Sequence, residues 1–326
     1  MKLLILGGAG FVGTNLVLGA LHWEGVRGVT VLDVVEPVSA GVFPWDDARV
    51  AFRRGDVRDA PLMAELVAAH DVIVNCAAQT SHPRSMQDPL EDASVNVLGN
   101  LTVLEAVRRA NPRARCVYVS TSTVVGRAQT PVVTEAHGEW ALDIYSSDKA
   151  AAEKHCFIYA QVHGLKVLTL RFANLYGPFG KNDPAFGFLN YFIALAQEGR
   201  DITVYGAGDQ QRNVMYVRDA VACMRHCLAH DAVFDGTPYF AVHDEHLSVN
   251  EIARGIVAAF GRGRIVERAW PAERAKIDVG AVTISGKRLR DATGWRARYG
   301  FSDGLRETRA TLEQTVAGAA QRVRSP

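Results

Sequence analysis

A tyrosine and a lysine, Tyr145 and Lys149, stand four residues apart just after a helix-start signal, in the stretch IYSSDK. Four residues are about one helical turn, so the two side chains share a helix face. A tyrosine phenol has an ordinary pKa of about 10 and is a poor base at neutral pH. A positive charge beside it stabilises the phenolate and lowers that pKa. Whether Tyr145 and Lys149 are a surface pair with ordinary pKa values or part of a reactive site depends on which other motifs lie near this turn.

A glycine-rich loop near the start of the chain predicts a phosphate-binding turn. GGAGFVG places Gly7, Gly10 and Gly13 directly after an apolar run and before a helical pattern. Glycine lets the backbone turn sharply and approach a pyrophosphate at the positive end of a helix. Asp33 follows twenty residues after Gly13, at the end of the second expected strand, where a carboxylate binds the adenosine ribose. The next two residues are valines with no cation for a 2′-phosphate, which favours NAD over NADP.

A second acidic residue follows the third expected strand. GDVRD places Asp56 and Val57 at the end of that strand, where they could contact the adenine. For Asp56, the N-cap of the next helix is an equally good interpretation.

Composition excludes several classes of protein. The chain has 326 residues, with 36 basic and 35 acidic side chains and a formal charge of +1, so no field of one sign favours nucleic acid or a membrane surface. No apolar run reaches transmembrane length. The start, MKLLILGGAGFVG, is better interpreted as a buried strand than as a signal peptide, because glycines interrupt it and no cleavage site follows. Five scattered cysteines, an odd number, favour reduced thiols in the cytoplasm.

Short β-branched runs alternate with longer helical patterns through the first half of the chain. Continuous apolar strands separated by helices predict a parallel sheet covered on both faces, a Rossmann-type doubly wound α/β fold. After residue 174 glycine and proline become frequent and the elements shorten. We expect a dinucleotide-binding domain over residues 1–172 with strands returning to the sheet at about 214–242. A smaller, interleaved substrate lobe is expected over 173–213 and 243–326.

Together these motifs resemble the extended short-chain dehydrogenase/reductase family, in its nucleotide-sugar epimerase and dehydratase branch, which includes UDP-glucose 4-epimerases. The strand CVYVSTSTVVG delivers hydroxyl residues to the carboxyl edge of the sheet, where doubly wound folds bind ligands. The resemblance covers nearly the whole chain. Further stretches that carry it are NCAAQTSHPRSMQDP, NVLGNL, RFANLYGP, VYGAGDQQRNVMYVRD and the terminal GW at Gly294 and Trp295.

The resemblance implies roles for the catalytic residues. Tyr145 would be the acid–base, Lys149 and the charge of the oxidised nicotinamide ring would lower its pKa, and Thr121 would hydrogen-bond the reacting sugar hydroxyl. A protein of this fold that only senses a dinucleotide is an alternative, but such proteins typically lose the Tyr-Lys pair. The expected NAD contacts are Gly7, Gly10, Phe11, Val12, Gly13, Asp33, Asp56, Val57, Ala77, Ala78, Gln79, Asn96, Ser120, Tyr145, Lys149 and Phe172.

An acidic pair is missing after the catalytic threonine. In the family, sugar 4,6-dehydratases have Asp-Glu there and related decarboxylases keep the glutamate, whereas this chain has Ser122 and Thr123. Hydroxyls cannot take over those proton transfers near neutral pH. The sequence therefore favours a nucleotide-sugar epimerase, with C4 of a UDP-hexose as the first expectation. A reductase, a 4,6-dehydratase or a decarboxylase with the same keto chemistry is the alternative.

The second lobe and one loop supply the expected sugar-nucleotide contacts. The family positions for diphosphate and base correspond to Asn174, Tyr205 and Arg212, with core packing as the alternative for Tyr205. A second phosphate cation would be Arg274 or Lys276, in RAKIDVG. Arg84 either recognises a C6 carboxylate or faces solvent. The other residues expected on the sugar side are Ser81, His82, Thr121, Ser122 and Thr123.

The stretch CMRHCLAH invites a zinc site, with Cys223, His226, Cys227 and His230 at helical spacing. A structural zinc site usually draws a closed set of ligands from separate elements, and cysteine is also a good buried apolar residue, so no metal is expected.

Apolar stripes predict a partner surface. The expected helices at about 91–110 and 145–163 carry more apolar residues than packing on the sheet requires. The family pairs these helices across a two-fold axis, so a homodimer through a four-helix bundle is expected. The alternative is a monomer whose helix backs are covered by Arg108, Lys154 and Gln161.

Overall fold

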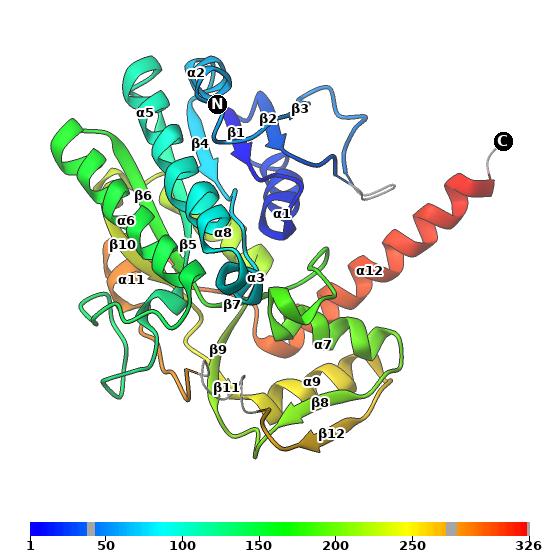
Figure 1. Cartoon of the computed structure of the whole chain (residues 1–326). Helices are drawn as coiled ribbons and strands as arrows, with labels where there is room; N and C mark the ends of the chain where they lie inside the picture. Colours follow the sequence, from blue (N-terminus) through cyan, green and yellow to red (C-terminus); the bar gives the residue numbers. More distant parts are fainter. Residues whose placement is uncertain (38–42, 272–278, 325–326) are drawn as a thin grey trace.

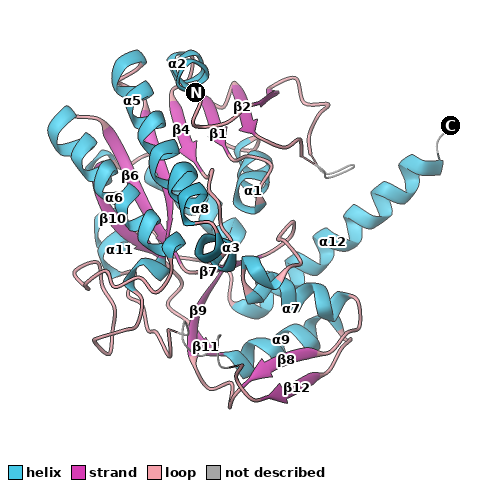
Figure 2. Cartoon of the chain, in the orientation of Figure 1, coloured by secondary structure: helices cyan, strands magenta, loops and turns pink. Residues whose placement is uncertain are grey.

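A seven-stranded parallel sheet, covered by helices on both faces, forms the larger part of the molecule (Figures 1 and 2). The computed structural model describes residues 1–37, 43–271 and 279–324. The strand order is β10-β6-β5-β4-β1-β2-β3, and every neighbouring pair is parallel. The doubly wound α/β fold expected from the sequence is confirmed.

The elements of the first part of the chain alternate as the sequence predicts. Their bounds are β1 Lys2–Leu6, α1 Phe11–Ala20, β2 Gly28–Asp33, β3 Val50–Arg54, α2 Ala60–Ala68, β4 Val72–Asn75, α3 His82–Gln87, α4 Pro89–Ala93, the π-helix η1 Ser94–Gly99, α5 Asn100–Ala110, β5 Arg115–Thr121, the 3₁₀ turn η2 Ser122–Val125, α6 Ile144–His163 and β6 Lys166–Phe172.

The remaining elements are shorter and mixed. They are β7 Asn174–Tyr176, η3 Pro184–Phe186, α7 Phe188–Gln197, β8 Ile202–Tyr205, β9 Gln211–Tyr216, α8 Val217–Cys227, η4 Asp231–Val233, β10 Asp235–Ala241, β11 His246–Ser248, α9 Val249–Phe260, β12 Ile265–Arg268, α11 Lys287–Thr293 and α12 Phe301–Arg324.

Two separate cores cover the two faces of the sheet, and the pleat of each strand divides its residues between them. In β1, Leu3 and Ile5 pack into one core with α1, α8 and α11. Leu4 and Leu6 point to the opposite face and pack with α2, α5 and α6. Because side chains alternate along a strand, one apolar run supplies both cores. This alternation also decides which active-site hydroxyl faces α6.

The smaller lobe has its own core and two small sheets. Strands β11, β9 and β7 form one sheet, and β12 pairs with β8 in the other. Helices α7, α9 and α12 pack with these strands, and the far end of α12 extends away from the body (Figure 1). Of the segment expected to return at about 214–242, β10 joins the large sheet and α8 packs on its helical layer, whereas β9 stays in the small sheet. The exact division into domains stays a prediction.

The cysteine-rich stretch is part of the core of the large sheet. Cys223 and Cys227 are fully buried there, and Nε2 of His226 lies 2.7 Å from the Thr293 carbonyl oxygen. All five cysteines are free. Over residues 1–37, 43–271 and 279–324, no group of three or more His, Cys, Asp or Glu is arranged to hold a metal ion. In the same ranges, no helix is long and apolar enough to cross a membrane.

Candidate active site

The glycine loop joins β1 to α1 and lies against the end of β4. Gly7 has φ +74°, and a Cβ there would stand 2.7 Å from the backbone of Ala77. A Cβ on Gly13 would stand 2.3 Å from the carbonyl oxygen of Gly7. The helix starts at Gly10 without a side-chain cap, so no side chain competes with a ligand for its first amides. This cradle fits a pyrophosphate, as the sequence predicts.

Asp33 ends β2 beside this loop. One carboxylate oxygen accepts a hydrogen bond from the Ala9 amide at 3.0 Å, and the other accepts one from the Val35 amide at 3.2 Å. The carboxylate is therefore fixed next to the phosphate loop, where the ribose of a dinucleotide would lie. The valines at 34 and 35 are both about half exposed. Loop and carboxylate together have the form of an NAD site.

Two of the residues that were expected to contact NAD have their side chains in the core. Val57 is 5% exposed and Phe172 is 3% exposed. Asp56 forms an ion pair with Arg58 at 2.7 Å, and this guanidinium lowers the pKa of its carboxyl. The N-cap interpretation of Asp56 is wrong, because Asp59 caps α2 by accepting a hydrogen bond from the Leu62 amide.

The loop after β4 is held by a buried hydrogen-bond network that the sequence did not reveal. Asn96 lies in the π-helix η1, accepts from the Gln79 amide at 3.1 Å and donates to the Gln79 carbonyl oxygen at 3.0 Å. Asp92 accepts from the side chains of both residues. Asn96 is only 2% exposed, so its side chain acts on the backbone of this loop, and its expected contact with NAD stays a prediction. A π-turn inside a longer helix often marks a functional position.

The expected catalytic pair lies in the first turns of α6. Tyr145 and Lys149 are both buried, at 9% and 3% exposure. The Lys149 ammonium donates to the Val119 carbonyl oxygen at 2.7 Å and lies 4.1 Å from the centre of the Tyr118 ring. The pair is thus locked against the end of β5, and a loosely solvated surface pair is excluded.

Without NAD the pKa of Tyr145 is raised, so the lowering expected from Lys149 and the nicotinamide charge together stays a prediction. Burial raises the pKa of Tyr145, and the charges of Asp143 and Asp92 raise it further. Burial also lowers the pKa of Lys149 to about 8, although the neighbouring Glu153 favours its charged form. A lowered pKa of Tyr145 would require the charges of Lys149 and of the bound nicotinamide together. The lysine is turned towards Val119, so the protein's own groups do not supply the whole effect.

Ser120 and Thr121 face opposite sides at the end of β5, as strand alternation requires. The Ser120 hydroxyl donates to Glu153, one helical turn beyond Lys149 on α6. Glu153 also accepts two hydrogen bonds of 3.0 Å from the fully buried Arg171. The Ser120 side chain is therefore part of a buried charge network. Any contact of Ser120 with the cofactor would have to come from its backbone.

Thr121 is the end of a short chain of hydroxyls. The Ser146 hydroxyl donates to the Thr123 hydroxyl at 2.7 Å, which lies 3.0 Å from the Thr121 hydroxyl. Because Thr123 already accepts from Ser146, its own proton can go to Thr121, and the proton of Thr121 is then available to a ligand. Thr123 was expected to contact the sugar, but in the structure it supports Thr121.

A histidine–aspartate pair lies beside the catalytic tyrosine. Nδ1 of His82 is 2.8 Å from a carboxylate oxygen of Asp143, and the His82 ring contacts the Tyr145 ring edge-on, with centres 4.8 Å apart. Asp143 is also the N-cap of α6, since its other oxygen accepts from the Ser146 amide at 2.8 Å. The sequence placed His82 on the sugar side, but it gave no sign that Asp143 would reach it.

The other residues of that loop are placed differently. Ser81 is buried and caps α3 by accepting from the Arg84 amide, so its side chain has a structural partner. Arg84 is exposed. Its possible recognition of a sugar carboxylate stays a prediction.

The residues of the second lobe that were expected to bind the nucleoside diphosphate lie in strands β7, β8 and β9. Asn174 donates to the Asn213 carbonyl oxygen at 2.8 Å. Tyr205 is half-buried and lies 5.6 Å from the Trp270 ring, centre to centre, so part of its surface is packed and part is open. Arg212 donates to the Gln211 carbonyl oxygen at 3.0 Å and to that of Gly280. Arg274 and Lys276 lie outside the described residues.

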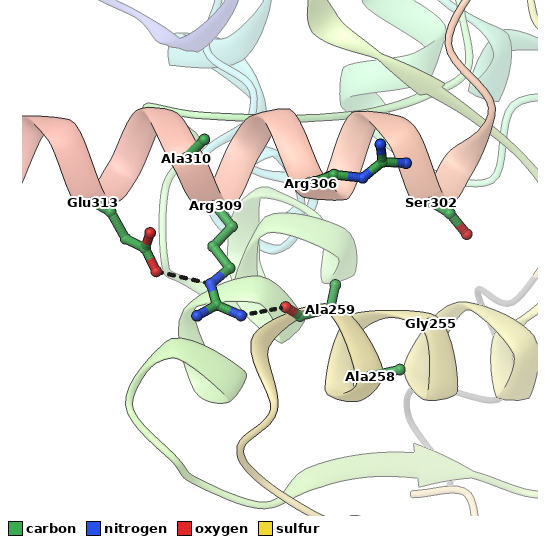
Figure 3. A pocket seen from close by; sticks show the side chains of 8 residues that line it. All are labelled: Gly255, Ala258, Ala259, Ser302, Arg306, Arg309, Ala310 and Glu313. Atoms are coloured by element: carbon green, nitrogen blue, oxygen red, sulfur yellow. Dashed lines mark hydrogen bonds and ion pairs between the residues drawn. The ribbon is translucent and has the colours of Figure 1, made fainter.

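A separate cavity of about 470 Å³ lies between α9 and α12 (Figure 3). Arg309 spans it and is bound to Glu313 and to the Ala259 carbonyl oxygen. None of the residues that line it is among the site residues expected from the sequence. These lining residues are Gly255, Ala258, Ala259, Ser302, Arg306, Arg309, Ala310 and Glu313.

Known proteins are similar to this chain over nearly its whole length. The model of the NAD dependent epimerase/dehydratase family matches residues 3–239. A dTDP-glucose 4,6-dehydratase of Streptomyces niveus is 31% identical, over 94% of this chain and 91% of its own. The solved dTDP-glucose 4,6-dehydratase of Streptomyces venezuelae, with NAD bound, is 26% identical with a TM-score of 0.83, over 96% of this chain and 97% of its own. The UDP-glucose 4-epimerase of Thermus thermophilus, in complex with NAD, is 28% identical with a TM-score of 0.82, over 96% and 99%.

Proposed function

The chain belongs to the NAD-dependent epimerase/dehydratase family, and we propose that within this family it is a nucleotide-sugar epimerase that forms a transient 4-keto sugar. The observation that carries the proposal is the end of β5, where Ser122 and Thr123 stand and the Thr123 hydroxyl is bound to Ser146 and Thr121. Loss of water from a sugar needs an acid and a base on the departing groups, and hydroxyls of ordinary pKa provide neither.

The protein's own groups can be assigned to the oxidation step. When bound, NAD accepts a hydride from the sugar carbon and can return it. Tyr145 takes the hydroxyl proton, because its phenol is buried in the first turn of α6 beside the end of β5. Thr121 donates its free proton to the same oxygen and holds it in place. Lys149, fixed by the Val119 carbonyl oxygen, supplies the positive charge beneath the site.

The substrate class follows from the relatives and from the second lobe. The relatives named above act on a dTDP-sugar or a UDP-sugar. In this chain, Asn174, Tyr205 and Arg212 are the residues we assign to the nucleoside diphosphate, and UDP-hexoses remain our first expectation.

A second candidate is a 4,6-dehydratase. The similarity to the dTDP-glucose 4,6-dehydratases supports it, since that name recurs among the relatives. Such a reaction would require acid–base groups other than Ser122 and Thr123. A reductase or a decarboxylase would share the same oxidation step, and a sensor would bind NAD without turnover.

The products of a sugar-nucleotide panel distinguish these candidates. Purified protein is incubated with the UDP-, dTDP-, GDP- and CDP-linked hexoses, and each mixture is followed by NMR. An epimer with unchanged composition is expected. A 4-keto-6-deoxy product would contradict the epimerase and establish the dehydratase. Retention of NAD with no conversion of any sugar would favour the sensor.

We also propose a homodimer through α5 and α6. On the outer side of α6, Phe157, Ile158 and Val162 are exposed at 44%, 45% and 70%, and Leu98 of η1 is exposed at 56%. Two of the three polar residues that could cover these helices have partners outside them, and the third, Arg108, is bound along α5 itself. Arg108 pairs with Glu105, Lys154 with Glu139, and Gln161 donates to the Asp235 carbonyl oxygen. Light scattering should give twice the 35.5 kDa chain mass. Val162→Glu should lower it, and a single-chain mass for the unchanged protein would rule out the dimer.

A further inference from the structure

His82 and Asp143 form a pair that the oxidation step does not use. They are 61 residues apart in sequence, and their side chains meet at 2.8 Å beside the ring of Tyr145. The His82 side chain is 32% exposed, whereas that of Asp143 is 11% exposed. The carboxylate is therefore on the protein side of the pair and the imidazole is on the open side, next to the residue that handles the sugar hydroxyl.

The partners of the pair determine the tautomer of His82. Burial raises the pKa of Asp143, but its hydrogen bonds with His82 and with the Ser146 amide act the other way, and the net direction is downward. The carboxylate is therefore ionised and can only accept hydrogen bonds. Nδ1 of His82 must carry the proton between them. Nε2 is left as the basic nitrogen, and it has no hydrogen-bond partner among the described residues.

A base beside Tyr145 gains a use once the sugar has been oxidised to a ketone. Once C4 of a sugar is a ketone, the hydrogens on the neighbouring carbons become acidic. Ser122 and Thr123 cannot remove such a proton, for the reason given above. A neutral imidazole oriented by a carboxylate is the side chain that most often takes this role in proteins.

We propose that His82, oriented by Asp143, is a second acid–base residue of this site and removes and returns the proton on a carbon next to the 4-keto group. This inference rests on the proposed nucleotide-sugar oxidation and adds a step to it. Nε2 takes the proton as the C–H electron pair moves into the ketone to form an enolate. The imidazolium then returns a proton to that carbon, on the same face or the opposite one. The step is balanced and needs no further reactant.

Exchange with solvent is the signature of this step. The reaction of the whole protein with UDP-glucose, and in parallel with dTDP-glucose, is run in D₂O and followed by NMR and mass spectrometry. We expect deuterium at C3 or C5 in the recovered sugar. Recovered sugar that has been oxidised and reduced, yet carries only protium at both carbons, would overturn the inference and leave the proposed function intact. Absence of any oxidation would contradict the proposed function instead.

Asp143→Asn tests the role of the tautomer. Asparagine is as good an N-cap as aspartate, so α6 keeps its start. Its amide can also donate to Nδ1 of His82, which moves the imidazole proton to Nε2 and removes the base. Deuterium incorporation should fall by about a hundredfold or more, the usual worth of general acid–base catalysis. Sugar oxidation, followed by the absorbance of the reduced cofactor, should fall much less, because Tyr145 and Lys149 are unchanged.

Two further variants separate chemistry from folding. His82→Gln should lose the exchange like Asp143→Asn, whereas His163→Gln, which changes an exposed histidine at the end of α6, should keep it. Exchange that survives in both His82→Gln and Asp143→Asn would contradict the proposal.

A measurement that needs no turnover decides the inference independently. Nitrogen-15 NMR of labelled histidine reports which ring nitrogen of His82 carries the proton. The unchanged protein should show the proton on Nδ1, and Asp143→Asn should show it on Nε2. A proton on Nε2 of the unchanged, neutral ring would overturn the proposal even if no sugar has yet been turned over.

Discussion

At the glycine loop, where the cofactor is expected, one segment of backbone packs directly against another. Gly7 approaches Ala77 so closely that a Cβ would stand at 2.7 Å, and Asp33 is fixed by two amides. On the sugar side, the contacts are hydrogen bonds between side chains from segments far apart in the sequence. His82 binds Asp143, and Thr123 links Ser146 to Thr121.

This difference separates what the family shares from what can vary. A backbone cradle tolerates little change, because every added atom collides with another part of the chain. The sugar side can exchange one polar side chain for another without moving the fold. Here it has Ser122 and Thr123 where dehydratases of the family have an acidic pair, and it has an imidazole beside the tyrosine. We therefore expect the type of reaction to depend on residues of the sugar side.

The largest effect is expected where the two sides meet, at Tyr145. Tyr145→Phe keeps the ring and removes the proton carrier, so turnover should fall by about two to four orders of magnitude. NAD affinity should barely change, because the glycine loop and Asp33 are untouched. Steady-state kinetics with the panel substrate and calorimetry with NAD measure the two quantities. Near-normal turnover would mean that another base operates, and a parallel loss of NAD affinity would show that the two sides are not separable.

A smaller effect is expected at Gly13, and it should fall on NAD affinity rather than on turnover. In Gly13→Ala the new Cβ would stand 2.3 Å from the Gly7 carbonyl oxygen, so the phosphate loop must shift. Such overpacking costs about 1 to 3 kcal/mol, or about 5- to 150-fold in NAD affinity if the shift is confined to the loop. Thermal unfolding of the cofactor-free variant is measured beside calorimetry.

The matched control is Gly28→Ala, at the start of β2, where the nearest atom would be 3.8 Å away. It should keep both NAD affinity and stability. Unchanged NAD affinity in Gly13→Ala would mean that this close backbone approach does not define the cofactor side.

The same difference explains which features the sequence could predict. The glycine loop, Asp33 and the Tyr145–Lys149 turn depend on short spacings within one or two elements, and the structure has them where the patterns place them. The contact of His82 with Asp143 and that of Ser120 with Glu153 depend on how α6 lies against the sheet. Residue types alone do not determine that geometry. The effect of burial on the pKa of Tyr145 could not be predicted for the same reason, since burial and the position of the Lys149 ammonium are tertiary properties.

The smallest effect is expected for the choice of cofactor, which depends on one charge. Asp33 lies where the ribose of a dinucleotide would bind, and a 2′-phosphate there would meet its carboxylate at close range. NADP should therefore bind at least about tenfold more weakly than NAD, a difference of about 1.4 kcal/mol. Asp33→Asn removes the repulsion, so the two affinities should approach each other. NAD itself should lose some affinity, because the amide can accept from only one of the two backbone amides that Asp33 now binds.

Asp71→Asn is the control, since Asp71 is 59% exposed and binds the Lys2 amide at the opposite end of β1. Calorimetry on cofactor-free protein measures the affinities of all three proteins for NAD and NADP, and equal binding of the two by the unchanged protein would show that cofactor choice does not depend on this carboxylate.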